Sequence, residues 1–197
     1  MTNAEYRERF YELYHAYITR AGAEEFLTYL EEKSDFFTAP ASTRFHLACE
    51  GGLLIHSVHV AEEMLKFEDE PAESAVLCGL LHDVCKMNFY AVGTRNRKNE
   101  QGKWETVPYY TVDDRFPYGH GEKSVFLIER FMRLSVPEAV AIRWHMGGFD
   151  DAVRGGNQSI SRAFETYPLA VKLHLADITA TYLVEGGSRD STGPSRA

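Results

Sequence analysis

The segment Leu80–Val84 places a histidine beside an aspartate, His82 and Asp83, within an otherwise apolar run. Burying an imidazole next to a carboxylate costs free energy unless a partner satisfies both groups. A metal ion is the best such partner, because it binds imidazole nitrogen and carboxylate oxygen together. His56 and Asp177 also lie in apolar segments with helical spacing. We therefore expect these four side chains to bind one transition metal ion.

Two further histidines, His120 and His145, lie between Asp83 and Asp177. With nitrogen and oxygen donors and no thiolate, the set favours Fe, Mn, Co, Ni or Zn over Ca or a structural zinc. Adjacent residues of a helix point about 100° apart, so Asp83 can share one ion with His82 or bridge to a second ion. The alternatives stay open: His120 could instead cap a helix or contact substrate, and His145 could belong to the core.

The remaining histidines are weaker candidates for ligands. His59 and His174 each lie three residues from a proposed ligand and share its helix face, so we expect them to be its outer partners. His15 and His46 are expected to be structural or exposed, because no proposed ligand shares their segments.

The charge distribution separates one segment from the rest of the chain. The net charge is −8, which argues against a surface that binds nucleic acid. Residues 84–99 nevertheless contain no acidic side chain and four basic ones: Lys86, Arg95, Arg97 and Lys98. A basic segment directly after the His-Asp pair favours a small anionic substrate, although exposed basic loops are common.

Lys86 is the strongest candidate for contacting such a substrate. It lies one helical turn after Asp83, close enough to reach a substrate oxygen near the metal. The alternative is a surface lysine whose apolar stem lies along the end of the helix. Arg95, Lys123 and Arg143 are further candidates for binding the anion.

Periodic apolar residues predict a largely helical chain. Helices are expected at 4–20, 23–33, 53–67, 75–86, 121–133, 137–146 and 168–184. Ser74 should cap the fourth of them. Aromatic and β-branched residues at 89–94 and 103–111, joined by a turn that contains Gly102, predict one hairpin. The fold class is therefore all-α with a small β-hairpin insertion.

The composition bounds the organisation of the chain. Its 197 residues, 44% of them hydrophobic, predict a single domain at 1–185 followed by a mobile tail at 186–197. We expect neither a signal peptide nor a membrane span, because no apolar run is long enough. The three cysteines have no zinc-like spacing and predict reduced, partly buried thiols in a cytoplasmic protein: Cys49, Cys78 and Cys85. A homo-oligomer is compatible with this sequence.

The order His, His-Asp, His, His, Asp, spread over residues 44–181, resembles the HD-domain superfamily of metal-dependent phosphohydrolases, and in particular its dinuclear branch. The likeness is carried by Gly-Gly-Leu-x-x-His-Ser around His56 and Ala-Asp-x-x-Ala around Asp177. The segments Arg44-Phe45-His46 and Val107-Pro108-Tyr109-Tyr110 resemble small bacterial and phage-encoded HD proteins. Met146 is a departure, since some hydrolases of this branch have a second histidine there.

The resemblance implies an HD-type helical bundle, with N-terminal helices at 4–33, an HD core at 44–184 and a hairpin insertion at 89–111. It also implies that Asp83 and Lys86 are catalytic. One or two divalent transition metal ions would be bound through six side chains: His56, His82, Asp83, His120, His145 and Asp177.

The function that this resemblance implies is metal-dependent hydrolysis of a phosphate ester or anhydride. The expected substrate is a nucleotide or another small phosphorylated compound. One alternative is a mixed-valence di-iron oxygenase, because such enzymes have the same fold and the same ligand order. Another is a non-catalytic ligand sensor, against which the intact set of ligands argues.

Overall fold

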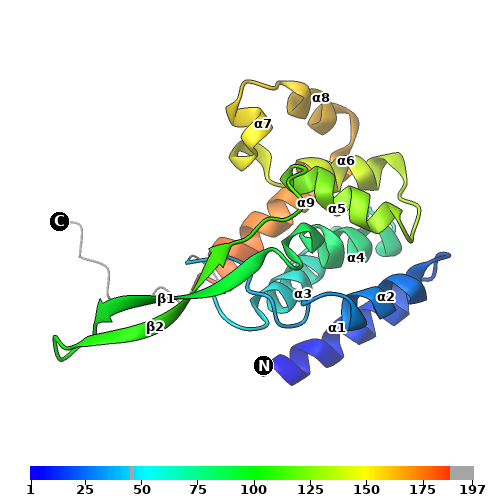
Figure 1. Cartoon of the computed structure of the whole chain (residues 1–197). Helices are drawn as coiled ribbons and strands as arrows, with labels where there is room; N and C mark the ends of the chain where they lie inside the picture. Colours follow the sequence, from blue (N-terminus) through cyan, green and yellow to red (C-terminus); the bar gives the residue numbers. More distant parts are fainter. Residues whose placement is uncertain (45–46, 187–197) are drawn as a thin grey trace.

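The computed structural model describes residues 1–44 and 47–186, so His46 and positions 187–197 of the expected tail lie outside the described residues. Helices make up most of it, and two strands form one antiparallel hairpin (Figure 1). The all-α fold class with a small hairpin insertion is therefore confirmed. The elements are α1 (Asn3–Tyr17), α2 (Ala23–Glu32), α3 (Gly52–Met64), α4 (Ala72–Leu81), β1 (Tyr90–Lys98), β2 (Trp104–Val112), α5 (His120–Glu129), α6 (Val136–Trp144), α7 (Asp151–Arg154), α8 (Ser159–Thr166) and α9 (Pro168–Thr179).

Helices α3 and α4 form the centre of the molecule. They pack against each other, and α9 packs against both. Gly79 of α4 permits the close approach, because a Cβ atom there would lie 2.4 Å from the Cα atom of Ala61 in α3. The same approach places the rings of His56 and His82 with their centroids 5.2 Å apart. Close packing of two apolar helices thus brings together two of the expected metal ligands.

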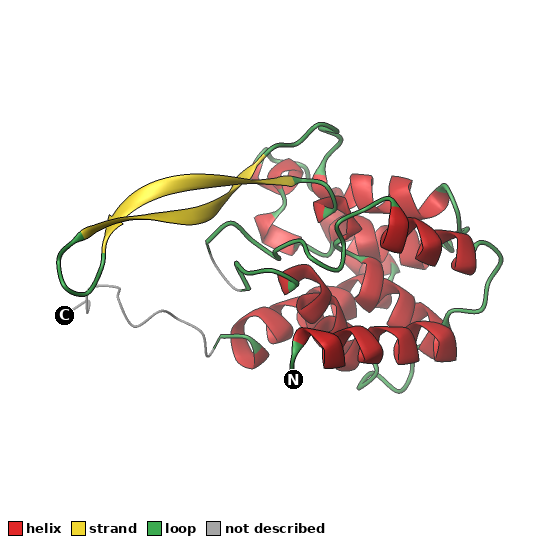
Figure 2. Ribbon diagram, turned by 60° about the horizontal axis from the view of Figure 1, so that its bottom comes forward, coloured by secondary structure: helices red, strands yellow, loops and turns green. Residues whose placement is uncertain are grey.

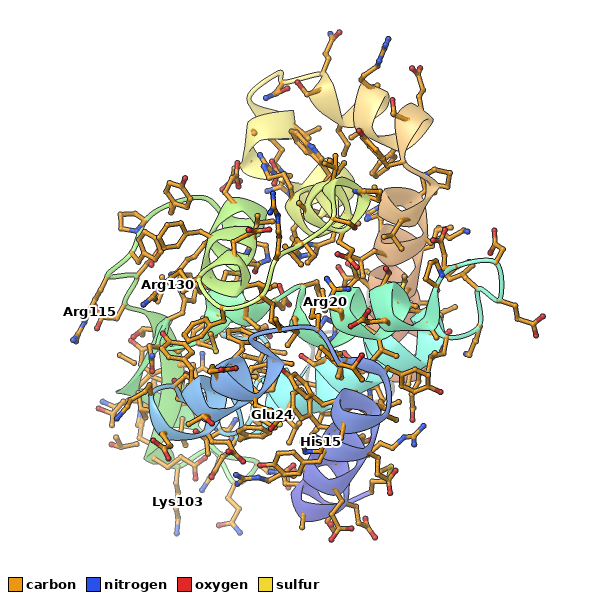
Figure 3. The ribbon with its side chains drawn as sticks, turned by 90° about the vertical axis from the view of Figure 1, so that its right-hand side faces the viewer. His15, Arg20, Glu24, Lys103, Arg115 and Arg130 are labelled. Atoms are coloured by element: carbon orange, nitrogen blue, oxygen red, sulfur yellow. The ribbon has the colours of Figure 1, made fainter. Side chains whose placement is uncertain are left out.

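The N-terminal helices are held to this centre by packing and by one buried ion pair. Helix α1 begins with a capping box, in which Thr2 and Glu5 exchange hydrogen bonds between side chain and backbone, and it packs against α3 and α4. Arg20 (Figure 3) donates two hydrogen bonds of 2.9 Å to the carboxylate of Glu138 in α6. This carboxylate is 1% exposed, so the pair joins two distant segments inside the fold.

The hairpin extends away from the helices (Figure 2). Its strands pair Tyr90 with Val112 at the base. At the tip, the side chain of Asn99 accepts two backbone hydrogen bonds, and Gly102 adopts a φ of 75° in the left-handed region. The hydroxyl of Tyr90 donates to the carbonyl oxygen of Ala41 at 3.3 Å, which connects the base of the hairpin to the helical body.

The first six expected helices all end earlier than their apolar patterns predict, and two of these ends involve proposed ligands. The helix expected to continue to residue 86 ends at Leu81, and a 3-10 turn follows at Val84–Lys86. His145 likewise lies just after the end of α6 rather than inside it. The last helix changes to a π-helix over Ala180–Val184. Three of the proposed ligands therefore lie just after helix ends, where the regular backbone pattern stops: His82, Asp83 and His145.

Two local expectations are wrong. Ser74 does not cap α4, which begins after Pro71; its hydroxyl instead donates to the carboxylate of Glu138 at 2.7 Å. The thiol groups also differ from one another, because Cys49 is exposed whereas the other two cysteines are buried. Within the described residues, no helix combines the length and apolar character needed to cross a membrane.

Candidate metal centre

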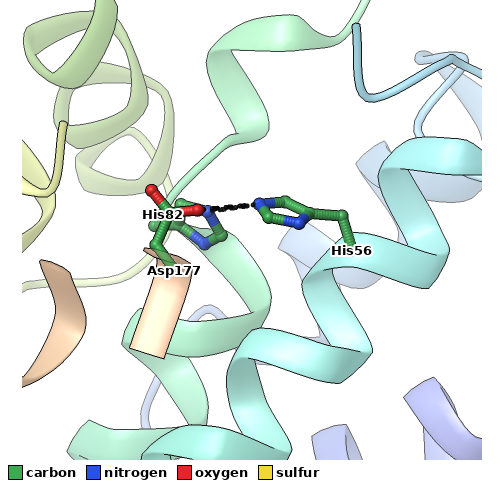
Figure 4. Close-up of side chains that lie close together, drawn as sticks. All are labelled: His56, His82 and Asp177. Atoms are coloured by element: carbon green, nitrogen blue, oxygen red, sulfur yellow. Dashed lines mark hydrogen bonds and ion pairs between the residues drawn. The ribbon is translucent and has the colours of Figure 1, made fainter. Parts of the chain in front are cut away.

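Three helical segments converge on one group of side chains: His56 on α3, His82 after α4, and Asp177 on α9 (Figure 4). Nε2 of His56 lies 3.2 Å from Oδ1 of Asp177 and 3.3 Å from Nε2 of His82. Both imidazoles are buried. The ligand atoms of the three residues lie within 4.8 Å of one another, a spacing at which they can hold one metal ion.

The carboxylate of Asp83 lies between this group and a second one. Its Oδ2 atom is 3.7 Å from Nε2 of His56 and 3.5 Å from Nε2 of His82. Its Oδ1 atom is 2.8 Å from Nε2 of His120 and 3.4 Å from Nε2 of His145. One carboxylate thus faces two pairs of imidazoles, the arrangement needed for a residue that bridges two ions.

Backbone carbonyl groups fix the protonation of two of these rings. Nδ1 of His82 donates to the carbonyl oxygen of Gly79 at 2.9 Å, and Nδ1 of His145 donates to that of Ile142 at 2.7 Å. With the proton on Nδ1, Nε2 is the atom of each ring that is left to bind a metal ion, and it faces Asp83.

His145 gives the clearest indication that these residues fit a metal ion. Its Nε2 atom is fully buried and has no hydrogen-bond partner in the described part of the chain. Buried polar atoms are almost always satisfied, so an imidazole nitrogen without a partner needs an explanation. A metal ion bound beside Asp83 would accept this lone pair and balance the carboxylate charge.

A hydrogen-bonded chain supports His56 from behind. Its Nδ1 atom lies 3.1 Å from Oε1 of Glu185, and the same oxygen lies 2.9 Å from Nδ1 of His59. Nε2 of His59 is in turn 2.8 Å from the hydroxyl of Tyr6 on α1. A carboxylate that accepts a hydrogen bond from the far side of a ligating imidazole fixes the ring and makes it a stronger ligand.

The histidines of the centre carry different charges when only protons are bound. Burial lowers the pKa of His82 to about 3, so this ring is neutral. Burial also disfavours the charged forms of His56 and His120, but interactions with neighbouring carboxylates, and for His120 first with Cys85, raise the pKa of each ring to about 10. Both nitrogen atoms of each of these two rings are therefore protonated at neutral pH. A metal ion would replace the proton on the nitrogen that it binds.

A cavity of about 1530 Å³ opens onto the centre, and His56, Asp83 and Asp177 line it. Lys86 also lines it, with Nζ 2.6 Å from Oδ2 of Asp83. Burial alone would lower the pKa of Lys86, but the charge of Asp83 raises it, so the ammonium group stays protonated. Basic and aromatic side chains from distant segments form much of the remaining lining: Arg44, Arg95, Arg154, Tyr109, Tyr110, Phe149 and Tyr182.

The family model of the HD domain matches residues 53–182, which is more than half of the chain. The chain belongs to the HD-domain family. HD-domain proteins bind divalent metal ions and are commonly hydrolytic enzymes, and the His and Asp groups described above could hold such an ion. Neither the curated proteins nor the solved structures contain a match to this chain.

Two of the basic side chains predicted to bind substrate lie outside the cavity lining of this HD domain. Arg143 pairs with Glu122 at 2.6 Å and with Asp150 at 2.8 Å. Lys123 is buried and lies 2.7 Å from Asp114. Each positive charge thus already has a carboxylate partner from its own neighbourhood, whereas Arg95 lies in the cavity lining as expected for a substrate contact.

The two outer histidines contact the centre in different ways. His59 contacts it through Glu185, and the side chain of His174 contacts the backbone of the proposed ligand His145. Nδ1 of His174 donates to the carbonyl oxygen of His145 at 2.6 Å. Sequence reasoning missed Glu185, because this residue follows the last apolar helix and no spacing connects it with His56. It also missed Cys85, whose Sγ atom lies 3.4 Å from Nδ1 of His120.

Proposed function

We propose that this HD domain hydrolyses a phosphate ester or anhydride of a small phosphorylated compound, with a nucleotide as the favoured substrate. The observation that carries the proposal is the juxtaposition of Asp83, shared by two groups of imidazoles, with the protonated Lys86 at a cavity. Bound metal ions would polarise the phosphoryl oxygen and lower the pKa of bound water toward neutrality. The six proposed ligands are His56, His82, Asp83, His120, His145 and Asp177.

The residues of the chain have separate tasks in this reaction. Lys86 is positioned to donate a charge-assisted hydrogen bond to a phosphoryl oxygen, where negative charge develops in the transition state. Arg95, on the hairpin side of the cavity, would bind a more distant part of the anion. Tyr109 and Tyr110 line the same region and offer aromatic faces to a nucleobase. The cavity therefore combines charge for phosphate with apolar surface for a base.

The proposal is tested by metal analysis of protein purified without added metal, together with a screen for hydrolysis of nucleotides and sugar phosphates. The screen is run in air and under anoxia with Mn, Fe, Co, Ni and Zn. We expect phosphate release that does not depend on oxygen. Asp83→Ala should lose metal and activity, whereas Asp114→Ala, which removes an acid paired with Lys123 outside the cavity lining, should keep both.

Two outcomes would replace this proposal. Conversion of a substrate only in air, with a redox-active pair of iron ions, would indicate a di-iron oxygenase. Metal-loaded protein that binds a nucleotide without turning it over would indicate a ligand sensor. Full metal stoichiometry in Asp83→Ala would contradict the proposed bridging role of that carboxylate.

A further inference from the structure

Two pairs that each combine an arginine with an aromatic ring line the cavity, and the function proposed above uses only one of them. On the hairpin, the guanidinium carbon of Arg95 lies 5.6 Å from the centroid of the Tyr109 ring. Gly93 lies opposite Tyr109 in the strand register, and a Cβ atom there would lie 3.1 Å from that ring. The absence of a side chain at position 93 therefore leaves room for the ring of Tyr109 against β1.

The second pair, Phe149 and Arg154, belongs to the segment that follows the proposed ligand His145. Phe149 ends the 3-10 turn Gly147–Phe149, and Arg154 ends α7. The guanidinium carbon of Arg154 lies 5.9 Å from the centroid of the Phe149 ring. Phe149 is 47% exposed and the side chain of Arg154 is 61% exposed, with a carboxylate oxygen of Asp151 4.0 Å away. An aromatic face and a positive charge are therefore both available to a ligand in the cavity.

Asp150 holds this second pair in place from inside the fold. Its side chain is 4% exposed, and one carboxylate oxygen accepts a hydrogen bond of 2.8 Å from Nη1 of Arg143. The other oxygen accepts one of 2.9 Å from the backbone N–H of Ala152, which caps α7. The turn that carries Phe149 and the helix that carries Arg154 are thus both attached to one buried ion pair. Such a support is what an exposed binding surface needs to keep its side chains in position.

The cavity is larger than a single nucleotide needs. Its volume is about 1530 Å³, whereas pockets for single small molecules span about 300–1000 Å³. The hairpin and α7 extend from the helical body in different directions (Figure 1). The two pairs are therefore carried by separate parts of the cavity lining, which also includes Asp83 and Lys86.

We propose that the pair of Phe149 and Arg154 is a subsite for a second nucleotide unit, so that the preferred substrate is a linear dinucleotide. Bases stack on aromatic rings and on guanidinium planes, and arginine also binds phosphate. One base would lie at Tyr109, the other at Phe149, and the connecting phosphodiester at Lys86. In the reaction, the water oxygen forms a new bond to phosphorus, the bond from phosphorus to the bridging oxygen breaks, and the released hydroxyl takes one proton of the water. The proposal rests on the proposed function and names the substrate of the same site.

Binding of uncleavable analogues tests the proposal without depending on catalysis. One probe is a linear diadenylate in which a CH₂ group replaces the ester oxygen that would leave, and the other is the matching phosphonate of a single adenosine. Isothermal titration calorimetry is run with the full chain in its metal-loaded form. We expect the dinucleotide probe to bind at least about tenfold more tightly than the mononucleotide probe, because stacking of one more base on an aromatic side chain contributes about a decade in affinity.

Phe149→Ala and Arg154→Ala should each weaken binding of the dinucleotide probe by about tenfold and leave that of the mononucleotide probe within about twofold of wild type. Arg162→Ala is the control, because Arg162 is exposed on the neighbouring helix α8 and is not part of the cavity lining. Three results would overturn the proposal: equal affinity of the two probes for the wild-type protein, no binding of either probe, or equal weakening of both probes in the variants.

The second subsite and the proposed hydrolysis fail separately. If the protein cleaves mononucleotides while the two probes bind equally, the hydrolase stands and the second subsite is wrong. If the dinucleotide probe binds more tightly and both variants lose that preference, the second subsite stands even when no substrate is cleaved.

Discussion

The ammonium group of Lys86 lies beside the carboxylate of Asp83, which two metal ions would share. From this position we predict a large effect on turnover. Replacing it in Lys86→Ala should lower turnover by about two decades, since a charge-assisted contact made mainly in the transition state contributes about 2–3 kcal/mol. Metal content should stay at the wild-type level. Steady-state kinetics and metal analysis measure both quantities.

The matched control for this variant is Lys66→Ala, because the side chain of Lys66 is 66% exposed and, among the described residues, forms an ion pair with Glu63 alone. Its turnover should equal that of wild type. If Lys86→Ala loses metal together with activity, Lys86 holds Asp83 in place and does not contact the substrate.

Glu185 is predicted to act through His56 as a positioning residue. Glu185→Gln keeps the shape of the side chain but removes the negative charge that strengthens the imidazole as a ligand. We expect metal affinity, measured by competition with a chelator, to fall by about tenfold. Activity should recover at excess metal, which loss of a catalytic group would not allow.

Tyr6→Phe tests the outer end of the same hydrogen-bonded chain. It removes the contact to His59 and leaves Glu185 against His56, so its effect on metal affinity should be smaller than that of Glu185→Gln. Unchanged metal affinity in Glu185→Gln would mean that the carboxylate only stabilises the end of the last helix.

Four of the proposed ligands were predictable because each is a polar residue in an apolar helical segment, and such residues need a partner: His56, His82, Asp83 and Asp177. His120 and His145 were identified by their place between Asp83 and Asp177, in the order typical of HD proteins. Their assignment to ions remains a prediction, but the structure brings all six together. Lys123 and Arg143 illustrate the limit of this reasoning. Charge alone marked them as anion-binding residues, whereas their carboxylate partners, such as Asp114, become visible only in three dimensions.

Between helices, the buried pair of Arg20 and Glu138 predicts an acid-sensitive contact. Burial would raise the pKa of Glu138, but the hydrogen bonds from Arg20 and other donors lower it from 4.5 to about 2. A carboxyl group whose pKa is lower in the folded state stabilises the fold fully above its unfolded pKa. That contribution, about 3 kcal/mol, is lost as the pH falls from about 4.5 through 2.

Glu138→Gln should therefore lower the free energy of unfolding by about 3 kcal/mol at pH 7, and the difference from wild type should shrink as the pH approaches 2. Denaturant unfolding at several pH values measures this. Glu73→Gln is the control, because Glu73 meets the same arginine from a more exposed position. A difference from wild type that does not vary with pH would rule out the ionised pair as the cause.

Apolar periodicity predicted the seven other helices but missed α7 and α8, and it did not predict where helices end. The π-helix at Ala180–Val184 is the clearest case. Its wider turn adds a residue, which rotates the following side chain by about 100° relative to a continued α-helix. Glu185 follows directly and lies against His56. No apolar pattern encodes such a turn, so the contact between Glu185 and His56 could not be predicted from the sequence.

At the scale of the whole molecule, the hairpin and the helices together line one cavity, which contains the proposed metal centre. Arg95 of β1 lines that cavity, whereas Arg97 pairs with Glu105 on the neighbouring strand and is 57% exposed. Arg95→Ala should raise KM for a phosphorylated substrate by about tenfold with little change in kcat, since it removes one charge-assisted contact distant from the reacting bond. Steady-state kinetics measure both parameters.

Arg97→Ala should leave KM unchanged, because its partner lies within the hairpin. Equal effects of the two substitutions would indicate that the hairpin attracts the anion through its overall charge and not through a specific contact.

The organisation of residues 1–185 as one domain remains a prediction. It is tested by whether the chain unfolds in a single cooperative transition.

The proposed ligands are spread along the chain from His56 to Asp177, and this separation has a consequence for synthesis. His56 and His82 are synthesised early, but the set of proposed ligands is incomplete until α9 has left the ribosome and docked against the other helices. The nascent chain can fold its early helices against one another without a complete site for the cation. The complete set of proposed ligands therefore becomes available to a metal ion only after α9 has docked.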